Sequence, residues 1–202
     1  MSKLAVASAF DQAQQLLSPT QVGVGTRGGA EATIHSIKRT VRRFPGLSVM
    51  QVDLVNAYGE AERGRALDQV AEHFPTIYRW VYKSYGGRNI MFFGDKPIEA
   101  TKGWQQGDPL SCLLFALTLR PITEEIKEKV KGLKLHVWFL DDGHVVGTLD
   151  QLREVARILV EQGPSQGLIL SRVGMAYDPK SRIWSSQAYL AEGPLGMEIP
   201  VL

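Results

Sequence analysis

Two apolar segments that flank a pair of aspartates constrain the fold of this chain most. Residues 134–140 read KLHVWFL, residues 144–149 read HVVGTL, and Asp141, Asp142 and Gly143 lie between them. Apolar, β-rich residues on both sides of an Asp-Gly pair predict an antiparallel β-hairpin, in which the glycine supplies the positive φ that a tight turn needs. A turn explains the Asp-Gly pair, but it explains neither the second aspartate nor the aromatic residues before it.

A third acid follows another predicted strand. Residues 47–54 read LSVMQVDL, which alternates in polarity, and Asp53 stands at the end of this strand. Taken alone, Asp53 is better explained as the N-cap of the next helix. Carboxylates at neighbouring strand ends of one sheet would together form an oxygen-rich site of the kind that Mg²⁺ prefers. Two such ions can stabilise the attacking and the leaving oxygen of a phosphoryl transfer.

The rest of the chain predicts an α+β fold. Amphipathic or capped segments predict helices over residues 4–17, 30–44, 60–73, 75–85, 109–130 and 149–163. Residues 88–100 predict a second hairpin that turns at Gly94-Asp95, and the polar segment TKGWQQGD (101–108) predicts a loop. This order of elements indicates an antiparallel sheet with helices packed mainly on one face.

Composition narrows the classes of protein to consider. A single cysteine, Cys112, excludes an internal disulfide and argues against a cysteine-based zinc site. No segment reaches the ~18 uninterrupted apolar residues of a membrane span, and the first residues lack the apolar core of a secretory signal. The sequence therefore predicts a soluble, intracellular protein with no membrane partner.

Basic residues gather in the predicted helix 30–44, although the formal net charge of the chain is only +2. Lys38, Arg39, Arg42 and Arg43 fall within six residues and have no acid among them. Such a cluster can follow a nucleic-acid backbone. A solvated helix face explains the same residues equally well.

Three segments together carry a family resemblance. QVDLVNAY (51–58), GWQQGDPLSCLLFALTLRPI (103–122) and VWFLDDG (137–143) resemble, in order and in spacing, three palm motifs of reverse transcriptases, most of all those of non-LTR retrotransposons. The upstream segment PTQVGVGTRGGAEATIH (19–35) is similar to the sequence before the first motif in the same group. We therefore expect an N-terminal helix over 1–18, a palm-like domain over 19–184 and a C-terminal extension over 185–202.

The resemblance implies a set of catalytic residues. Asp53 and Asp141 would hold two Mg²⁺ ions, which Mn²⁺ can replace, and Asp142 would be a more auxiliary metal ligand near the primer end. Lys180 would match the lysine of the fourth palm motif, which donates a proton to the leaving pyrophosphate or balances its charge. That fourth motif is irregular here, because Gly167-Leu168 is followed by no asparagine and by an apparent insertion before Lys180.

The resemblance also implies substrate contacts. Tyr58 matches the aromatic position that packs under the incoming sugar and excludes a 2′-hydroxyl, although a core tyrosine remains an alternative. Gln106 and Gly107 would line the floor below the nascent base pair and the template backbone. The substrates would be an RNA template, a DNA primer and a dNTP.

Two functions follow from the resemblance. The first is an RNA-directed DNA polymerase palm that carries two-metal nucleotidyl transfer and acts in the nucleus if it comes from an active retroelement. We expect it to lack most of the fingers and thumb, and therefore to bind template and primer weakly on its own. The alternative is a domesticated, inactive palm that serves as a structural or RNA-binding subunit of a larger assembly, in which other proteins replace those regions.

Overall fold

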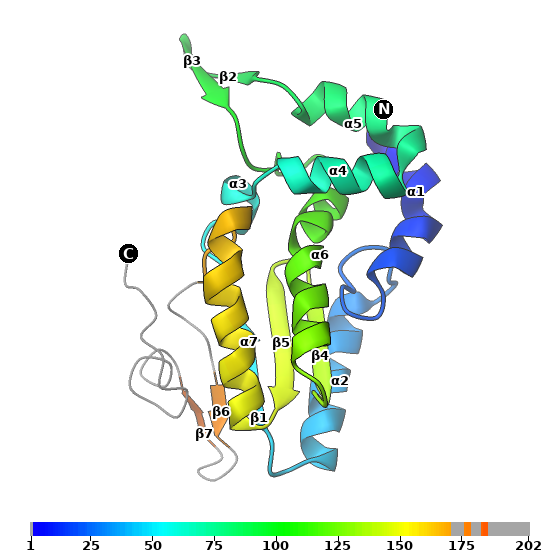
Figure 1. Ribbon diagram of the computed structural model, residues 1–202. Helices are drawn as coiled ribbons and strands as arrows, with labels where there is room; N and C mark the ends of the chain where they lie inside the picture. The colour runs from blue at the N-terminus through cyan, green and yellow to red at the C-terminus, as the bar shows by residue number, and fades with distance from the viewer. Residues whose placement is uncertain (1, 171–175, 179–182, 186–202) are drawn as a thin grey trace.

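The computed structural model describes residues 2–170, 176–178 and 183–185. Its main sheet has the strand order β4-β5-β1-β6-β7, and every neighbouring pair is antiparallel. These strands are β1 (Ser48–Val52), β4 (Leu135–Phe139), β5 (Asp142–Gly147), β6 (Ala176–Asp178) and β7 (Ile183–Ser185). A separate hairpin of β2 (Asn89–Phe93) and β3 (Lys96–Ala100) extends from one end of the molecule (Figure 1).

Helices cover this sheet mainly on one face, as predicted. They are α1 (Ser2–Leu17), α2 (Gly29–Arg43), α3 (Ala57–Glu60), α4 (Gly64–His73), α5 (Pro75–Tyr85), α6 (Ser111–Lys129) and α7 (Leu149–Gln162), followed by a 3₁₀ turn over Gly163–Gln166. In Figure 1, α6 and α7 lie across the front of β5 and β1. The exception is α2, which packs against β4 from behind, so that Gly29 adjoins the ring of Phe139. The α+β architecture is confirmed.

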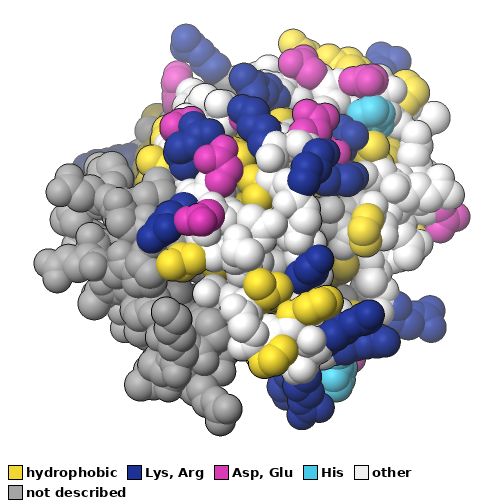
Figure 2. Space-filling model, turned by 60° about the horizontal axis from the view of Figure 1, so that its bottom comes forward, with side chains coloured by type: hydrophobic (Ala, Val, Ile, Leu, Met, Phe, Trp, Pro, Cys, Tyr) yellow, Lys and Arg dark blue, Asp and Glu magenta, His cyan; other side chains and the backbone are white. Residues whose placement is uncertain are grey.

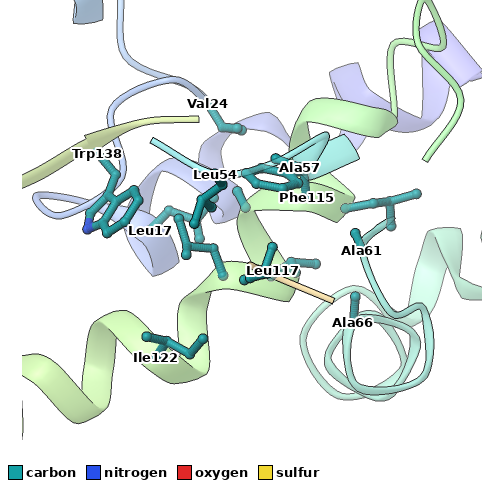
Figure 3. Close-up of a cluster of buried hydrophobic side chains, with 14 of the residues drawn as sticks. Leu17, Val24, Leu54, Ala57, Ala61, Ala66, Phe115, Leu117, Ile122 and Trp138 are labelled. Atoms are coloured by element: carbon teal, nitrogen blue, oxygen red, sulfur yellow. The ribbon is translucent and has the colours of Figure 1, made fainter. Parts of the chain in front are cut away.

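The core is built around α6 because the first half of that helix is apolar on every side. Phe115 and Leu117 of this helix are completely buried, and so is Trp138 of β4. Figure 3 shows Phe115 and Leu117 between Trp138 on one side and Ala61 and Ala66 on the other. A helix that is apolar all round needs neighbours all round, and the sheet, α4, α7 and α1 supply them.

Helix α6 continues through Pro121, which has no backbone N–H to donate to the carbonyl of Leu117. The buried side chain of Gln69 fills that position, since its Nε2 donates to Leu117 O at 2.6 Å. Arg120 Nη1 in turn donates to Gln69 Oε1 at 3.0 Å, which fixes the orientation of the amide. A residue of α4 therefore completes the hydrogen bonding of α6.

The hairpin turn lies earlier than predicted, since of the predicted turn residues Asp141, Asp142 and Gly143 only Asp141 belongs to it. Phe139 pairs with Asp142, so the turn consists of Leu140 and Asp141, and the positive φ of 56° belongs to Leu140. Gly143 lies within β5, where its missing side chain makes room for the Trp138 ring: a Cβ there would stand 2.7 Å from ring atoms. Steric space, rather than backbone conformation, explains the glycine.

Two predicted helices begin later in the structure. The segment predicted as helix 60–73 is broken before Gly64, because Ala61 O accepts from Gly103 N and Glu62 N donates to Gln166 O instead of entering a helix. The helix predicted from 109 begins at Ser111, after a turn in which Ser111 N donates to the carbonyl of Asp108. In both places long-range or turn hydrogen bonds take the backbone groups that a helix would need.

Helix α2 packs on the rest of the fold through small residues. Gly29 and Thr33 are buried, whereas the larger Ile34 is 51% exposed. The backbone of Val22 lies so close to the first turn of α2 that only a glycine fits there, because a Cβ on Gly29 would stand 2.1 Å from the carbonyl oxygen of Val22. Within the described residues, no helix is long and apolar enough to cross a membrane.

Candidate active site

The register of the sheet brings the three predicted acids together. Val52, the last residue of β1, pairs with Gly143 of β5, so Asp53 follows directly beside the start of β5. Asp142 is the first residue of β5, and Asp141 occupies the turn before it. Acids that are 88 positions apart in the chain (141 minus 53) therefore meet at one end of two adjacent strands.

The carboxyl groups interact electrostatically. Burial raises the pKa of Asp141, a hydrogen bond to its own backbone lowers it, and the negative charges of Asp142 and Asp53 raise it again. Among the described residues, none of the three acids forms a salt bridge. A half-buried carboxylate beside two others, with no salt-bridge partner among the described residues, is an environment that favours a bound cation.

The carboxylate oxygens of these acids are ligands of the kind that Mg²⁺ prefers. No group of three or more potential metal-ligating side chains lies close enough to hold an ion within the residues that the structure describes. Mg²⁺ usually takes only one or two protein carboxylates and completes its shell with water and substrate phosphates. Asp53 and Asp141 on adjoining strands therefore fit a metal that arrives with a phosphate, but they do not form a closed protein cage.

Tyr58 lies close to these acids. It belongs to the short helix α3, its ring stacks on Phe115 with centroids 4.6 Å apart, and its hydroxyl donates to Cys112 Sγ at 3.7 Å. Burial raises the pKa of Tyr58, with further contributions from Cys112 and from the charge of Asp141. The side chain is only partly buried, so one part of the ring packs on the core while the residue still borders the acids.

The loop 101–108 is anchored at its centre by Trp104, which is not among the predicted site residues. Trp104 is 3% exposed, its Nε1 donates to Thr118 Oγ1 at 3.0 Å, and its backbone N donates to Tyr58 O at 2.7 Å. Gly103 must be a glycine here, because its φ is +77° and a Cβ would stand 2.4 Å from Gly59 O. The sequence feature that could have identified Trp104 is its place inside a polar, glycine-rich loop, where burial is the explanation for such a large apolar ring.

This anchoring exposes the next residues of the loop. Gln106 and Gly107, both predicted to contact substrate, are exposed, and the φ of Gly107 is +91° with open space around it. Gln106 lines a cavity of about 620 Å³ together with Gly59, Trp104 and residues of the β2–β3 hairpin. The loop therefore presents polar groups beside the turn that carries Tyr58.

The basic cluster of α2 lies away from the acids. Lys38, Arg39, Arg42 and Arg43 are all exposed, and Figure 2, which brings the lower end of the molecule forward, shows lysine and arginine side chains gathered at one edge of that face. Helix α2 begins next to Phe139, beside the hairpin turn, and at 1.5 Å per residue its basic positions lie roughly 14–21 Å farther along. The structure thus separates the cluster from the acid site. Lys180 lies outside the described residues.

Comparisons with known proteins support the fold. No family model matches the sequence, and a search of curated proteins found no match. Among solved structures, an apo telomerase from Candida tropicalis, truncated from its C-terminal domain, matches with a TM-score of 0.56 and 10% identity over 92% of this chain and 44% of that one. A telomerase from Candida albicans, solved in complex with the TWJ fragment of telomeric RNA, matches with a TM-score of 0.53 and 15% identity over 85% of this chain and 33% of that one.

This chain therefore spans less than half of the length of both telomerase chains. At 10% and 15% identity, the likeness shows the fold alone. Telomerase is a reverse transcriptase-related enzyme, so the chain has a reverse transcriptase-like fold.

Proposed function

We propose that this chain is the palm of an RNA-directed DNA polymerase of the non-LTR retrotransposon type, and that it carries nucleotidyl transfer. The observation that carries the proposal is the meeting of Asp53, Asp141 and Asp142 at adjoining strand ends of a reverse transcriptase-like fold. The neighbouring Tyr58 supports it, because the charge of Asp141 contributes to the raised pKa of Tyr58. The exposed loop at Gln106 is tied to Tyr58 through Trp104, whose backbone N donates to Tyr58 O. Each acid alone has a structural explanation, but their convergence has none.

In this function the chain would act mainly through charge and position. Asp53 and Asp141 would hold Mg²⁺, with Asp142 beside them, and Mn²⁺ is a plausible substitute. The bound metal would activate the primer 3′-oxygen and balance the charge that develops on the phosphates. The chain itself contributes two rigid strands, which keep the carboxylates at a fixed separation while a dNTP is exchanged.

Tyr58 would select the sugar of the incoming nucleotide. Its stacking on Phe115 and its hydrogen bond to Cys112 leave the ring little freedom to move aside. A ribose 2′-hydroxyl directed at this ring would meet a fixed surface, so a dNTP would be preferred to an rNTP. The exposed Gln106 and Gly107 would support the base pair from the other side.

The nucleic-acid partners would be an RNA template and a DNA primer. The Candida albicans telomerase with the same fold was solved with a telomeric RNA fragment, which is consistent with an RNA partner here. The exposed cluster Lys38–Arg43 would contact the backbone of the duplex at a distance from the acids, because phosphate contacts spread along a groove provide much of the affinity.

Primer extension tests the proposal. The native chain should extend a DNA primer on an RNA template with Mg²⁺ and dNTPs, and Asp141→Asn should abolish extension while preserving shape. Asp95→Asn is a matched control, because Asp95 is an exposed acid at the tip of the β2–β3 hairpin. Extension that survives in Asp141→Asn, or that is lost equally in Asp95→Asn, would contradict the assignment of the acids.

A second candidate function is that of a structural or RNA-binding subunit without catalysis. The observation that favours it is the β2–β3 hairpin, where Phe92 and Phe93 are 72% and 79% exposed. Large exposed apolar surfaces mark interaction sites. Tight RNA binding that is unchanged by Asp141→Asn, with no extension by the native chain, would support this function over the polymerase.

A further inference from the structure

The segment Thr20–Gly23 lies along the free edge of β4, next to the candidate active site. Val22 N donates to Trp138 O at 2.8 Å, and Trp138 N donates to Thr20 O at 2.7 Å. These two bonds form a parallel bridge between Gln21 and Trp138. The segment that precedes α2 therefore acts as a short extra strand beside the hairpin that carries Asp141.

From this position the side chain of Gln21 reaches the hairpin turn. Its Oε1 accepts from Leu140 N at 2.8 Å and from Gly23 N at 2.9 Å, while its Nε2 donates to Leu140 O at 3.1 Å. Gln21 is 4% exposed, so water does not compete well for these bonds. One amide thus binds both backbone groups of the residue directly before Asp141.

Leu140 needs such support because its backbone is unfavourable. Its φ of +56° is a left-handed conformation, which costs a residue with a side chain roughly 1–2 kcal/mol. Gly23 packs closely on the same residue, since a Cβ there would stand 2.7 Å from Leu140 N and from its Cγ. Without these contacts, Leu140 would have little reason to keep the conformation that determines where Asp141 points.

We propose that Gln21 is a positioning residue for Asp141: it holds the Leu140–Asp141 turn in the one conformation that sets the Asp141 carboxylate beside Asp53. This inference rests on the proposed function. In this role Gln21 acts through the backbone of Leu140, to which its amide is bonded. Its loss would therefore impair metal binding and the chemical step more than it impairs nucleotide binding.

Matched variants separate positioning from stability. Gln21→Met keeps the length of the side chain and removes all three hydrogen bonds. Gln69→Met removes the same kind of buried amide, which bonds a backbone carbonyl in the same way, but between α4 and α6. If Gln21→Met does not fold, Gln21→Asn takes its place, because the shorter side chain keeps an uncharged amide but withdraws it from both backbone groups of Leu140.

The native chain and the variants are compared in primer extension, with Mg²⁺ titrated and kcat and the KM for dNTP measured separately. For Gln21→Met we expect kcat to fall by on the order of ten- to a hundredfold, as a misplaced catalytic group implies, with a raised half-saturating Mg²⁺ concentration and a KM for dNTP that changes little. Gln69→Met should keep the native Mg²⁺ dependence although it unfolds more easily. Equal losses in both variants, or a native Mg²⁺ dependence in Gln21→Met, would overturn the inference.

Binding of Mn²⁺ alone, followed by electron paramagnetic resonance, keeps the two proposals distinguishable. If the native chain does not extend primers, the proposed function fails. The inference on Gln21 then depends on whether Gln21→Met binds Mn²⁺ several-fold more weakly than the native chain and Gln69→Met do. Equal affinities, or no Mn²⁺ binding by the native chain, would overturn it as well.

Discussion

Because Gly143 lies against the Trp138 ring, Gly143→Ala should destabilise the fold, and a second mutation that shortens the ring should remove this effect. In Gly143→Ala the new Cβ would stand 2.7 Å from two atoms of the Trp138 ring and 2.8 Å from a third. Trp138 is completely buried, and its Nε1 donates to His136 Nε2 at 2.9 Å, so the ring cannot move without losing a hydrogen bond. The φ of Gly143 is not in the left-handed region, so the cost comes from the ring alone.

The magnitude follows from two opposing terms. Overpacking of a closely packed core costs about 1–3 kcal/mol. Replacing glycine by alanine also reduces the entropy of the unfolded chain, which stabilises the folded state by roughly 0.4–1 kcal/mol. We therefore expect Gly143→Ala to lower the free energy of unfolding by about 0.5–2 kcal/mol.

A double-mutant cycle with Trp138→Phe tests this reasoning by urea unfolding. The shorter phenylalanine ring would free the space that the new Cβ needs. In the Trp138→Phe background, Gly143→Ala should then become neutral or stabilising, with a coupling energy of about 1–2 kcal/mol between the two positions. Additive effects of the two mutations would refute the steric explanation of Gly143.

Three further predictions concern pH, metal and backbone. Burial lowers the pKa of His136 from 6.5 to about 4, so the unfolded chain takes up the proton first, and stability should be lost as the pH falls from about 6.5 toward 4. His136→Gln keeps an acceptor for Trp138 and should flatten that part of the stability curve, measured by urea unfolding at each pH. Asp141→Asn should raise the Tm of the metal-free chain at neutral pH, because a raised carboxyl pKa means that ionisation of Asp141 opposes folding. The same variant should reduce the gain in Tm on adding Mn²⁺, and an unchanged gain would argue against Asp141 as a ligand. Gly167→Ala should lower the free energy of unfolding by more than about 2 kcal/mol, since its φ is +71° and a Cβ would stand 1.8 Å from Glu60 O; urea unfolding with a small change would contradict this.

Local pattern was sufficient for most elements. The predicted helix 4–17 is α1, the predicted strand before Asp53 is β1, and the second hairpin turns at Gly94-Asp95 as expected. These segments combine a clear periodicity with turn or capping residues, and such information is local. Helix α7 was equally clear, since Thr148 and Gln151 form a capping box at its start.

Local pattern failed where close steric packing decided which residue occupies a position. The β4–β5 turn formed at Leu140 and Asp141 rather than at the Asp-Gly pair, because Gly143 is needed where Trp138 packs. Helix α2 buries Gly29 and Thr33 rather than Ile34, because Val22 approaches its first turn closely. Neither close approach can be recognised from hydrophobic periodicity or from turn residues.

For the candidate site, local sequence was enough to identify the three acids and their order: Asp53 after one strand, and Asp141 and Asp142 between two others. That information is local, since each acid follows an apolar β-rich segment. That the acids meet follows only from the fold, through the pairing of Val52 with Gly143. The fold also decided that Gln21 holds the turn and that the basic cluster lies at a distance. These relations depend on strand register and on contacts between remote segments, which are set by packing of the whole core.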